Sequence, residues 1–173
     1  MIDLKPFCST AQWRTNIRAP WTRGGYTYAT NGFVALRVPA RADVPDNPTA
    51  PNGARIFEQL PGASAQYVPL ATFAFPPRPD CPYCIGTGLV VCRCSTCDNE
   101  HVKPCTSCPI EKLLLGTGRN EARYNGAWIR RLATLPGCEI CPCGQGEAAH
   151  FRFDSGDGLI MPLRPLDQKG ARR

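Results

Sequence analysis

Hydrophobic and polar positions alternate most regularly between residues 26 and 38 of the 173-residue chain. Aromatic and β-branched residues stand on both sides of Asn31-Gly32, a dipeptide suited to the positive φ angles of a tight turn between strands. We therefore predict a β-hairpin over residues 26–38. The four prolines that follow predict a loop over residues 39–51.

Helical spacing of apolar residues follows Asn125 and continues to Leu135. Asn125 is a suitable N-cap, and Pro136-Gly137 predicts the end of the helix. The residues that can share one face are Trp128, Ile129, Leu132 and Leu135.

Weaker patterns predict the remaining elements. These are a short helix over residues 56–60, a strand over 66–75 that stops at the prolines of residues 76–79, and two strands over 150–153 and 159–163 joined by a turn over 154–158. Asp154 and Asp157 would cap backbone amides in that turn, and residues 167–173 would be frayed.

Composition favours short strands and turns, because the chain contains 18 prolines and 16 glycines. With 43% apolar residues it can bury a modest core beside a metal-stabilised lobe. We predict an α+β protein, with an antiparallel sheet and two helices. No apolar run is long enough for a signal peptide or a membrane span, so a cytoplasmic protein with no membrane partner is expected.

Seven of the 11 cysteines lie between residues 81 and 108. Cys81 and Cys84 form one C-x-x-C pair, and Cys105 and Cys108 form another. Two such pairs can supply four thiolates to one Zn²⁺ at roughly 2.3 Å, which closes a tetrahedral site with no open position for a substrate. An odd number of cysteines in a reducing compartment also favours zinc over disulfides.

The other cysteines predict a second zinc, with three arrangements open. Cys92, Cys94, Cys97 and His101 form a local set. Alternatively, Cys94 and Cys97 join two of Cys138, Cys141 and Cys143, which would tie the lobe to the main domain. In the third arrangement, Cys94 and Cys97 join Cys81 and Cys84 in one site. Cys105 and Cys108 then join two of the three cysteines after residue 137 in the other. Cys8 stands alone and is expected to be a buried apolar residue.

The formal net charge of +6 lies outside the cysteine-rich lobe. Guanidinium groups suit contact with phosphate oxygens, so nucleic acid is a candidate partner. The candidate contact residues are Arg119, Arg123, Arg130 and Arg131.

Catalysis finds little support in the sequence. His101 lies among candidate zinc ligands, and His150 stands at the start of a predicted strand, where a packing or solvated role is expected. The chain has no Gly-x-Ser-x-Gly elbow, no Walker loop and no zinc-deaminase signature. We therefore expect a protein that is not an enzyme.

Two resemblances extend this interpretation. Cys81-Pro-Tyr-Cys84-Ile-Gly-Thr-Gly88 is similar to the repeating C-x-x-C-x-G-x-G unit in the cysteine-rich domain of J-domain co-chaperones. The chain has one full unit and no His-Pro-Asp sequence, so the resemblance implies a zinc knuckle without chaperone activity.

The flanking segments resemble bacterial DNA sliding clamps, the β subunit of the replicative polymerase. Residues 28–36 are similar to the A-T-D-G-x-x-L-A hairpin of that family, residues 122–132 to its strand leading into a second helix, and residues 158–164 to its V-M-P-M-R strand. The resemblance implies one discontinuous clamp-like domain, residues 1–75 plus 119–173, with a zinc-binding insert over residues 76–118. A single domain encircles DNA only as a ring of several copies, so a homo-oligomer is a further expected partner.

The clamp strand lines a groove for short motifs of polymerases and repair proteins, so Met161, Pro162 and Arg164 become candidate peptide-groove residues by resemblance. Small cysteine-rich proteins of this kind also resemble those encoded by bacteriophages. We therefore expect a zinc-binding protein, acting in the cytoplasm of a bacterial host, that engages replication, repair or defence proteins. The alternative is a basic zinc protein that binds DNA or RNA directly.

Overall fold

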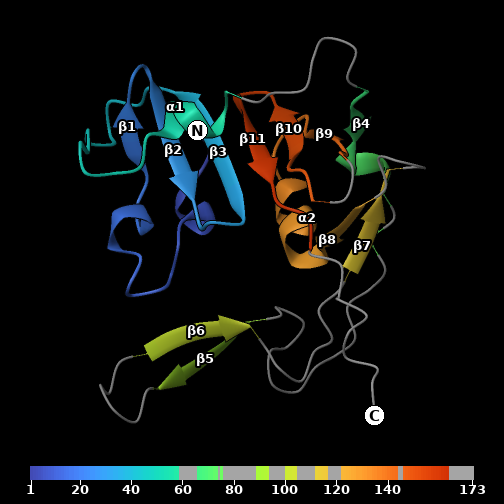
Figure 1. Ribbon diagram of the computed structural model, residues 1–173, viewed down its shortest axis with the longest axis horizontal. Coiled ribbons are helices and arrows are strands. Elements are labelled where there is room, and N and C mark those ends of the chain that lie inside the picture. Colours follow the sequence, from blue (N-terminus) through green and yellow to red (C-terminus); the bar gives the residue numbers. More distant parts are fainter. Residues whose placement is uncertain are drawn as a thin grey trace.

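Seven antiparallel strands form the main sheet, in the order β1-β2-β3-β11-β10-β9-β4 (Figure 1). The computed structural model describes residues 1–58, 66–73, 75, 89–93, 100–104, 112–116, 122–143 and 146–163, with the backbone alone for 89–93, 100–104 and 112. The strands of this sheet are β1 (Trp21–Arg23), β2 (Tyr26–Thr30), β3 (Val34–Pro39), β4 (Val68–Pro69), β9 (Glu139–Cys141), β10 (Ala149–Phe153) and β11 (Gly156–Ile160).

Two further strand pairs and several short helices complete the described elements. The strand pairs are β5 (Leu89–Arg93) with β6 (Glu100–Pro104), and β7 (Lys112–Leu115) with β8 (Ala122–Asn125). The helices are α1 (Gly53–Ile56), α2 (Gly126–Leu132) and the 3₁₀ turns η1 (Lys5–Phe7), η2 (Thr15–Ile17) and η3 (Leu70–Thr72). A large antiparallel sheet with few helices agrees with the predicted α+β class at a coarse level.

The sheet joins the two ends of the sequence, because β3 pairs with β11 in register Leu36 to Gly158. The predicted hairpin is present as β2 and β3, but its turn lies one residue later than expected. Asn31 donates its backbone N–H to the Val34 carbonyl, and its side-chain oxygen accepts from the amides of Phe33 and Val34. Gly32 and Phe33 therefore occupy the turn, with Gly32 at φ 91°.

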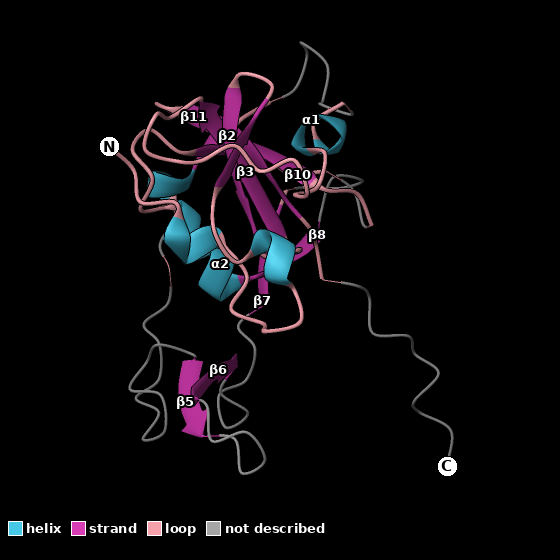
Figure 2. Cartoon of the chain, turned by 90° about the vertical axis from the view of Figure 1, so that its left-hand side faces the viewer, coloured by secondary structure: helices cyan, strands magenta, loops and turns pink. Residues whose placement is uncertain are grey.

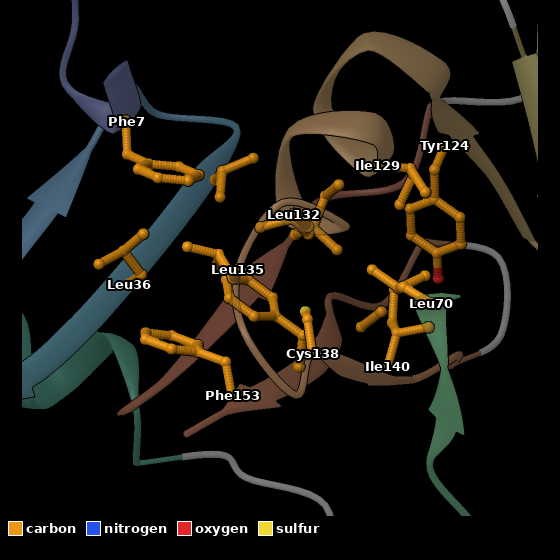
Figure 3. Close-up of a cluster of buried hydrophobic side chains, with 14 of the residues drawn as sticks. Phe7, Leu36, Leu70, Tyr124, Ile129, Leu132, Leu135, Cys138, Ile140 and Phe153 are labelled. Atoms are coloured by element: carbon orange, nitrogen blue, oxygen red, sulfur yellow. The ribbon is translucent and has the colours of Figure 1, made fainter. Parts of the chain in front are cut away.

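One face of the sheet carries the main hydrophobic core, which α2 covers (Figures 2 and 3). Leu36 of β3 and Phe151 of β10 face Ile129 and Leu132 of α2 in this core, and all four are fully buried. Gly158 leaves room for the neighbouring aromatic ring, because a Cβ there would lie 2.0 Å from Cζ of Phe151.

The opposite face of the sheet has a smaller core at its β1–β3 end. Trp21 and Tyr28 stack there with ring centroids 5.7 Å apart, and Phe57 packs on Tyr28. The short helix α1 lies on this face (Figure 2), where Gly53 sits directly against the Tyr28 ring. Successive strand residues alternate between faces, so Tyr28 and its neighbour Ala29 contribute to different cores.

The strand β8 leads directly into α2, as the helical pattern predicts. The Asn125 side chain accepts a hydrogen bond from the Ala127 amide at 2.9 Å, which confirms the predicted N-cap. The helix ends at Leu132, earlier than predicted, although the Leu135 amide still bonds to the Leu132 carbonyl. Leu135 is therefore buried with the core from a turn, and not from the helix.

Three predicted boundaries were wrong. Among the described residues of the strand expected over 66–75, only Val68–Pro69 pairs, and the chain then turns into η3. The helix expected over 56–60 is the earlier α1, and residues 59–60 lie outside the described part of the chain. The last strand begins at Gly156 and ends at Ile160, because the turn contains only Asp154 and Ser155. Pro162 lacks the amide that would continue the ladder. Among the described residues, no helix is long and apolar enough to cross a membrane.

Candidate metal centre and interaction surface

Most of the predicted zinc ligands lie outside the described residues. They are Cys81, Cys84, Cys94, Cys97, Cys105 and Cys108. The first predicted site therefore remains a prediction from spacing.

Cys92 and His101 belong to the described strands β5 and β6. The register of this antiparallel pair sets Cys92 directly opposite His101. Directly opposed residues in an antiparallel pair share one face. The backbone thus brings two candidate ligands of the local second site to adjacent positions.

Of the three cysteines after residue 137, one lies in the core and the other two lie close to each other. Cys138 lies among the core side chains (Figure 3), and burial raises the pKa of its thiol to about 12. Cys141 ends β9 opposite His150, and the Cys143 sulfur lies 3.8 Å from the Cys141 carbonyl oxygen. Burial raises the pKa of both these thiols as well. Of the three, only Cys141 and Cys143 form a pair that a shared metal ion would suit.

The described side chains alone do not complete a metal site. No group of three or more His, Cys, Asp or Glu side chains in this part of the chain is arranged to hold a metal ion. The four cysteines whose side chains are described, Cys8, Cys138, Cys141 and Cys143, are free thiols. Cys8 is buried in the core, as predicted.

A polar network crosses the sheet on the face opposite the main core, and the sequence did not predict it. Arg37 of β3 donates from Nε to Asp157 Oδ1 at 2.7 Å and from Nη2 to Asp157 Oδ2 at 3.1 Å. Asp157 Oδ2 also lies 3.1 Å from Nε2 of His150, and the Tyr67 hydroxyl is hydrogen-bonded to His150 Nδ1. Arg37 also lies over the Phe57 ring at 4.4 Å.

This network links side chains of β3, β11 and β10 on one face of the sheet. His150 is buried and has a side-chain partner on each ring nitrogen, which fits the packing role expected for it. Burial raises the pKa of the Asp157 carboxyl, but hydrogen bonds from His150 and Arg37 outweigh burial, so its net pKa lies below the usual value. The predicted turn-capping role of Asp157 was wrong, since the residue is part of β11.

Replacing Asp157 by asparagine is expected to lower the free energy of unfolding by about 1–2 kcal/mol at pH 7, because Arg37 loses a charged, partly buried partner. The folded-state pKa of Asp157 is depressed, so its contribution is present above the unfolded pKa of about 3.9 and is lost as the pH falls through the folded value. In urea unfolding between pH 3 and pH 7, the free energy of unfolding of the variant should therefore fall less steeply as the pH is lowered than that of wild type. The control Asp43→Asn, which removes an exposed carboxylate that pairs with Arg41, should leave stability unchanged. Equal effects of the two substitutions would contradict the network.

The predicted nucleic-acid arginines do not all present free guanidinium groups. Arg119 lies outside the described residues, whereas Arg123 is exposed on β8. Arg130 lies over the Phe75 ring at 5.0 Å. Arg131 donates to the Pro6 carbonyl at 2.6 Å, and burial lowers the pKa of its guanidinium. Arg130 and Arg131 therefore already make contacts within the protein.

The candidate peptide-groove residues follow β11 and lie beside the β2–β3 turn. The Met161 amide donates to the Phe33 carbonyl at 2.8 Å, and the Leu163 amide donates to the Arg123 carbonyl at 2.7 Å. Phe33 is 60% exposed and Met161 is 47% exposed, whereas Pro162 is half-buried. Phe33 and Met161 form an exposed apolar surface, here called the Phe33–Met161 surface. Arg164 lies outside the described residues.

Comparison with protein-family models, with curated proteins and with solved structures found no match for this chain.

Proposed function

We propose that the chain is a zinc-binding, non-catalytic interaction protein that holds a protein partner on the Phe33–Met161 surface. The single observation that carries the proposal is this pair of exposed apolar side chains, which a backbone hydrogen bond joins at one end of the sheet. Large apolar side chains that remain exposed next to each other mark interaction sites more often than isolated ones do.

The sequence resemblance supports the same surface. The segment that resembles the clamp hairpin spans β2 and β3, and the segment that resembles the clamp closing strand includes β11. The strands β3 and β11 are neighbours in the sheet. Met161 follows the second of them, at the position where the clamp family binds short linear motifs. We propose that the domain is clamp-like and that its partner belongs to the replication, repair or defence machinery of a bacterial host, with the chain encoded by a bacteriophage.

Zinc would shape the cysteine-rich segment of the chain. Cysteine and histidine are the donors of closed structural zinc sites, and the opposed positions of Cys92 and His101 support the local second site. Cys141 and Cys143 are the alternative pair. Their thiols would be protonated at neutral pH without a cation, and a bound Zn²⁺ would deprotonate them. The metal would supply rigidity and no catalytic step.

The substitution Met161→Glu tests the proposal. A buried carboxylate at the centre of an apolar contact should weaken capture of the partner from host lysate by about tenfold or more, which corresponds to roughly 1.4 kcal/mol. The matched control is Ile56→Glu on α1, an exposed apolar residue outside this surface. Quantitative mass spectrometry of the captured proteins gives the measurement.

Retention of the same replication or repair proteins by wild type and Met161→Glu would contradict the proposed surface. An equal loss of those proteins in Met161→Glu and Ile56→Glu would contradict it too, because the effect would then come from added negative charge. Circular dichroism of both variants checks that the fold is intact.

A further inference from the structure

An exposed tryptophan lies in a basic loop that the proposed function does not use. Trp13 is 76% exposed, whereas Trp21 is buried and Trp128 is half-buried. The loop of residues 9–18 is closed by a hydrogen bond from the Ser9 amide to the Ile17 carbonyl at 2.9 Å. Trp13 is therefore presented by an ordered turn of the backbone, since the Arg14 and Ile17 amides also bond within this loop.

The neighbouring arginine covers one side of the indole. The Arg14 guanidinium carbon lies 4.5 Å from the ring centroid of Trp13. Its Nη1 donates to the Asn31 carbonyl at 2.6 Å and lies against Gly32, where a Cβ would come within 2.0 Å of it. This contact fixes the cation and the ring together, while most of the indole surface remains in solvent.

The positive charge of this region indicates which class of partner it can bind. No acidic residue occurs between Asp3 and Asp43, and the cations in that interval are Lys5, Arg14, Arg18, Arg23, Arg37 and Arg41. Arg37 and Arg41 are paired with carboxylates. Arg18 is exposed at the end of the loop, and it makes no side-chain hydrogen bond or ion pair with the described residues. An exposed aromatic ring next to arginines that have no carboxylate partner in the described part of the chain suits a polyanion that also carries planar rings.

We propose that Trp13, Arg14 and Arg18 form a binding surface for single-stranded nucleic acid. A base stacks on the open part of the Trp13 ring, and Arg18 contacts a backbone phosphate. Stacking on exposed aromatic rings is tolerant of sequence, and it requires an unpaired base. Guanidinium contact with phosphate makes the affinity salt-dependent. The surface is separate from the Arg119, Arg123, Arg130 and Arg131 set.

The test uses the full chain and a fluorescein-labelled oligothymidylate of about sixteen nucleotides. We expect binding to quench tryptophan fluorescence, because Trp13 is the exposed indole. The affinity should fall roughly threefold between about 50 and about 200 mM salt for the one phosphate contact of Arg18. Trp13→Ala should weaken binding by about tenfold, and Trp13→Phe should restore most of it. Arg18→Gln should weaken binding, whereas the control Arg55→Gln, on α1, should not.

Several results would overturn the proposal. They are equal binding by wild type and Trp13→Ala, equal weakening by Arg18→Gln and Arg55→Gln, or preference for a duplex of the same length. Trp13-dependent binding of an acidic peptide or of anionic vesicles, without binding of the oligonucleotide, would also overturn it. A failure here leaves the Phe33–Met161 surface untouched, since that surface is tested by protein capture.

Discussion

Replacing Phe151 by alanine is expected to lower the free energy of unfolding by about 3–5 kcal/mol. The ring is fully buried, stacks on Phe153 with centroids 6.2 Å apart, and fills the space above Gly158. Its removal leaves a cavity at the centre of the sheet, where the strands from the two ends of the sequence meet. Urea denaturation followed by circular dichroism measures the loss.

The matched control is Phe33→Ala, which removes the same side chain from an exposed turn. Surface substitutions change stability by about 0.5 kcal/mol or less, so this variant should unfold like wild type. Under the proposed function it should nevertheless lose partner capture. Similar unfolding free energies for the two variants would contradict the described core.

The second large effect concerns the cysteine-rich segment. Cys105→Ser is expected to remove one zinc ion per chain, because a serine hydroxyl is a poor substitute for a thiolate ligand. The free energy of binding structural zinc is about 10 kcal/mol or more, so the segment that this ion organises should become sensitive to proteolysis. The zinc content of the purified variant under reducing conditions is the measurement.

Cys8→Ala and Cys138→Ala are the controls for this loss. Both thiols lie among the apolar side chains of the core. These residues should therefore not be ligands, and both variants should keep the zinc content of wild type. Loss of zinc from the Cys138 variant, with none from the Cys105 variant, would reverse the ligand assignment.

Local signals predicted much of the fold. The strands β2 and β3 and the helix α2 were found because alternation, an Asn-Gly pair and an N-cap act between residues close in sequence. The turn shifted to Gly32 and Phe33 because the Asn31 side chain bonds to the next amides, and hydrogen-bond geometry of this kind is not visible in composition.

Contacts between distant residues could not be predicted. Arg37 and Asp157 are separated by 120 positions, so the polar network appears only once β3 pairs with β11. The only hint in the sequence was the alternation along each strand, which places Arg37 and Asp157 on the face opposite the main core. The sequence also could not show that Cys138 is buried in the core while Cys141 and Cys143 are not part of it. The path of β9 decides this, because cysteine spacing alone does not tell a buried thiol from a metal ligand.

The zinc content of the purified chain, measured per chain under reducing conditions, tests the central claim most directly. If thiolate and imidazole ligands organise the segment around residues 81–108, as proposed, each chain should hold at least one tightly bound zinc ion, and two if the second site forms. Protein that is folded and fully reduced but holds no zinc or other transition metal would contradict the proposed zinc-binding function.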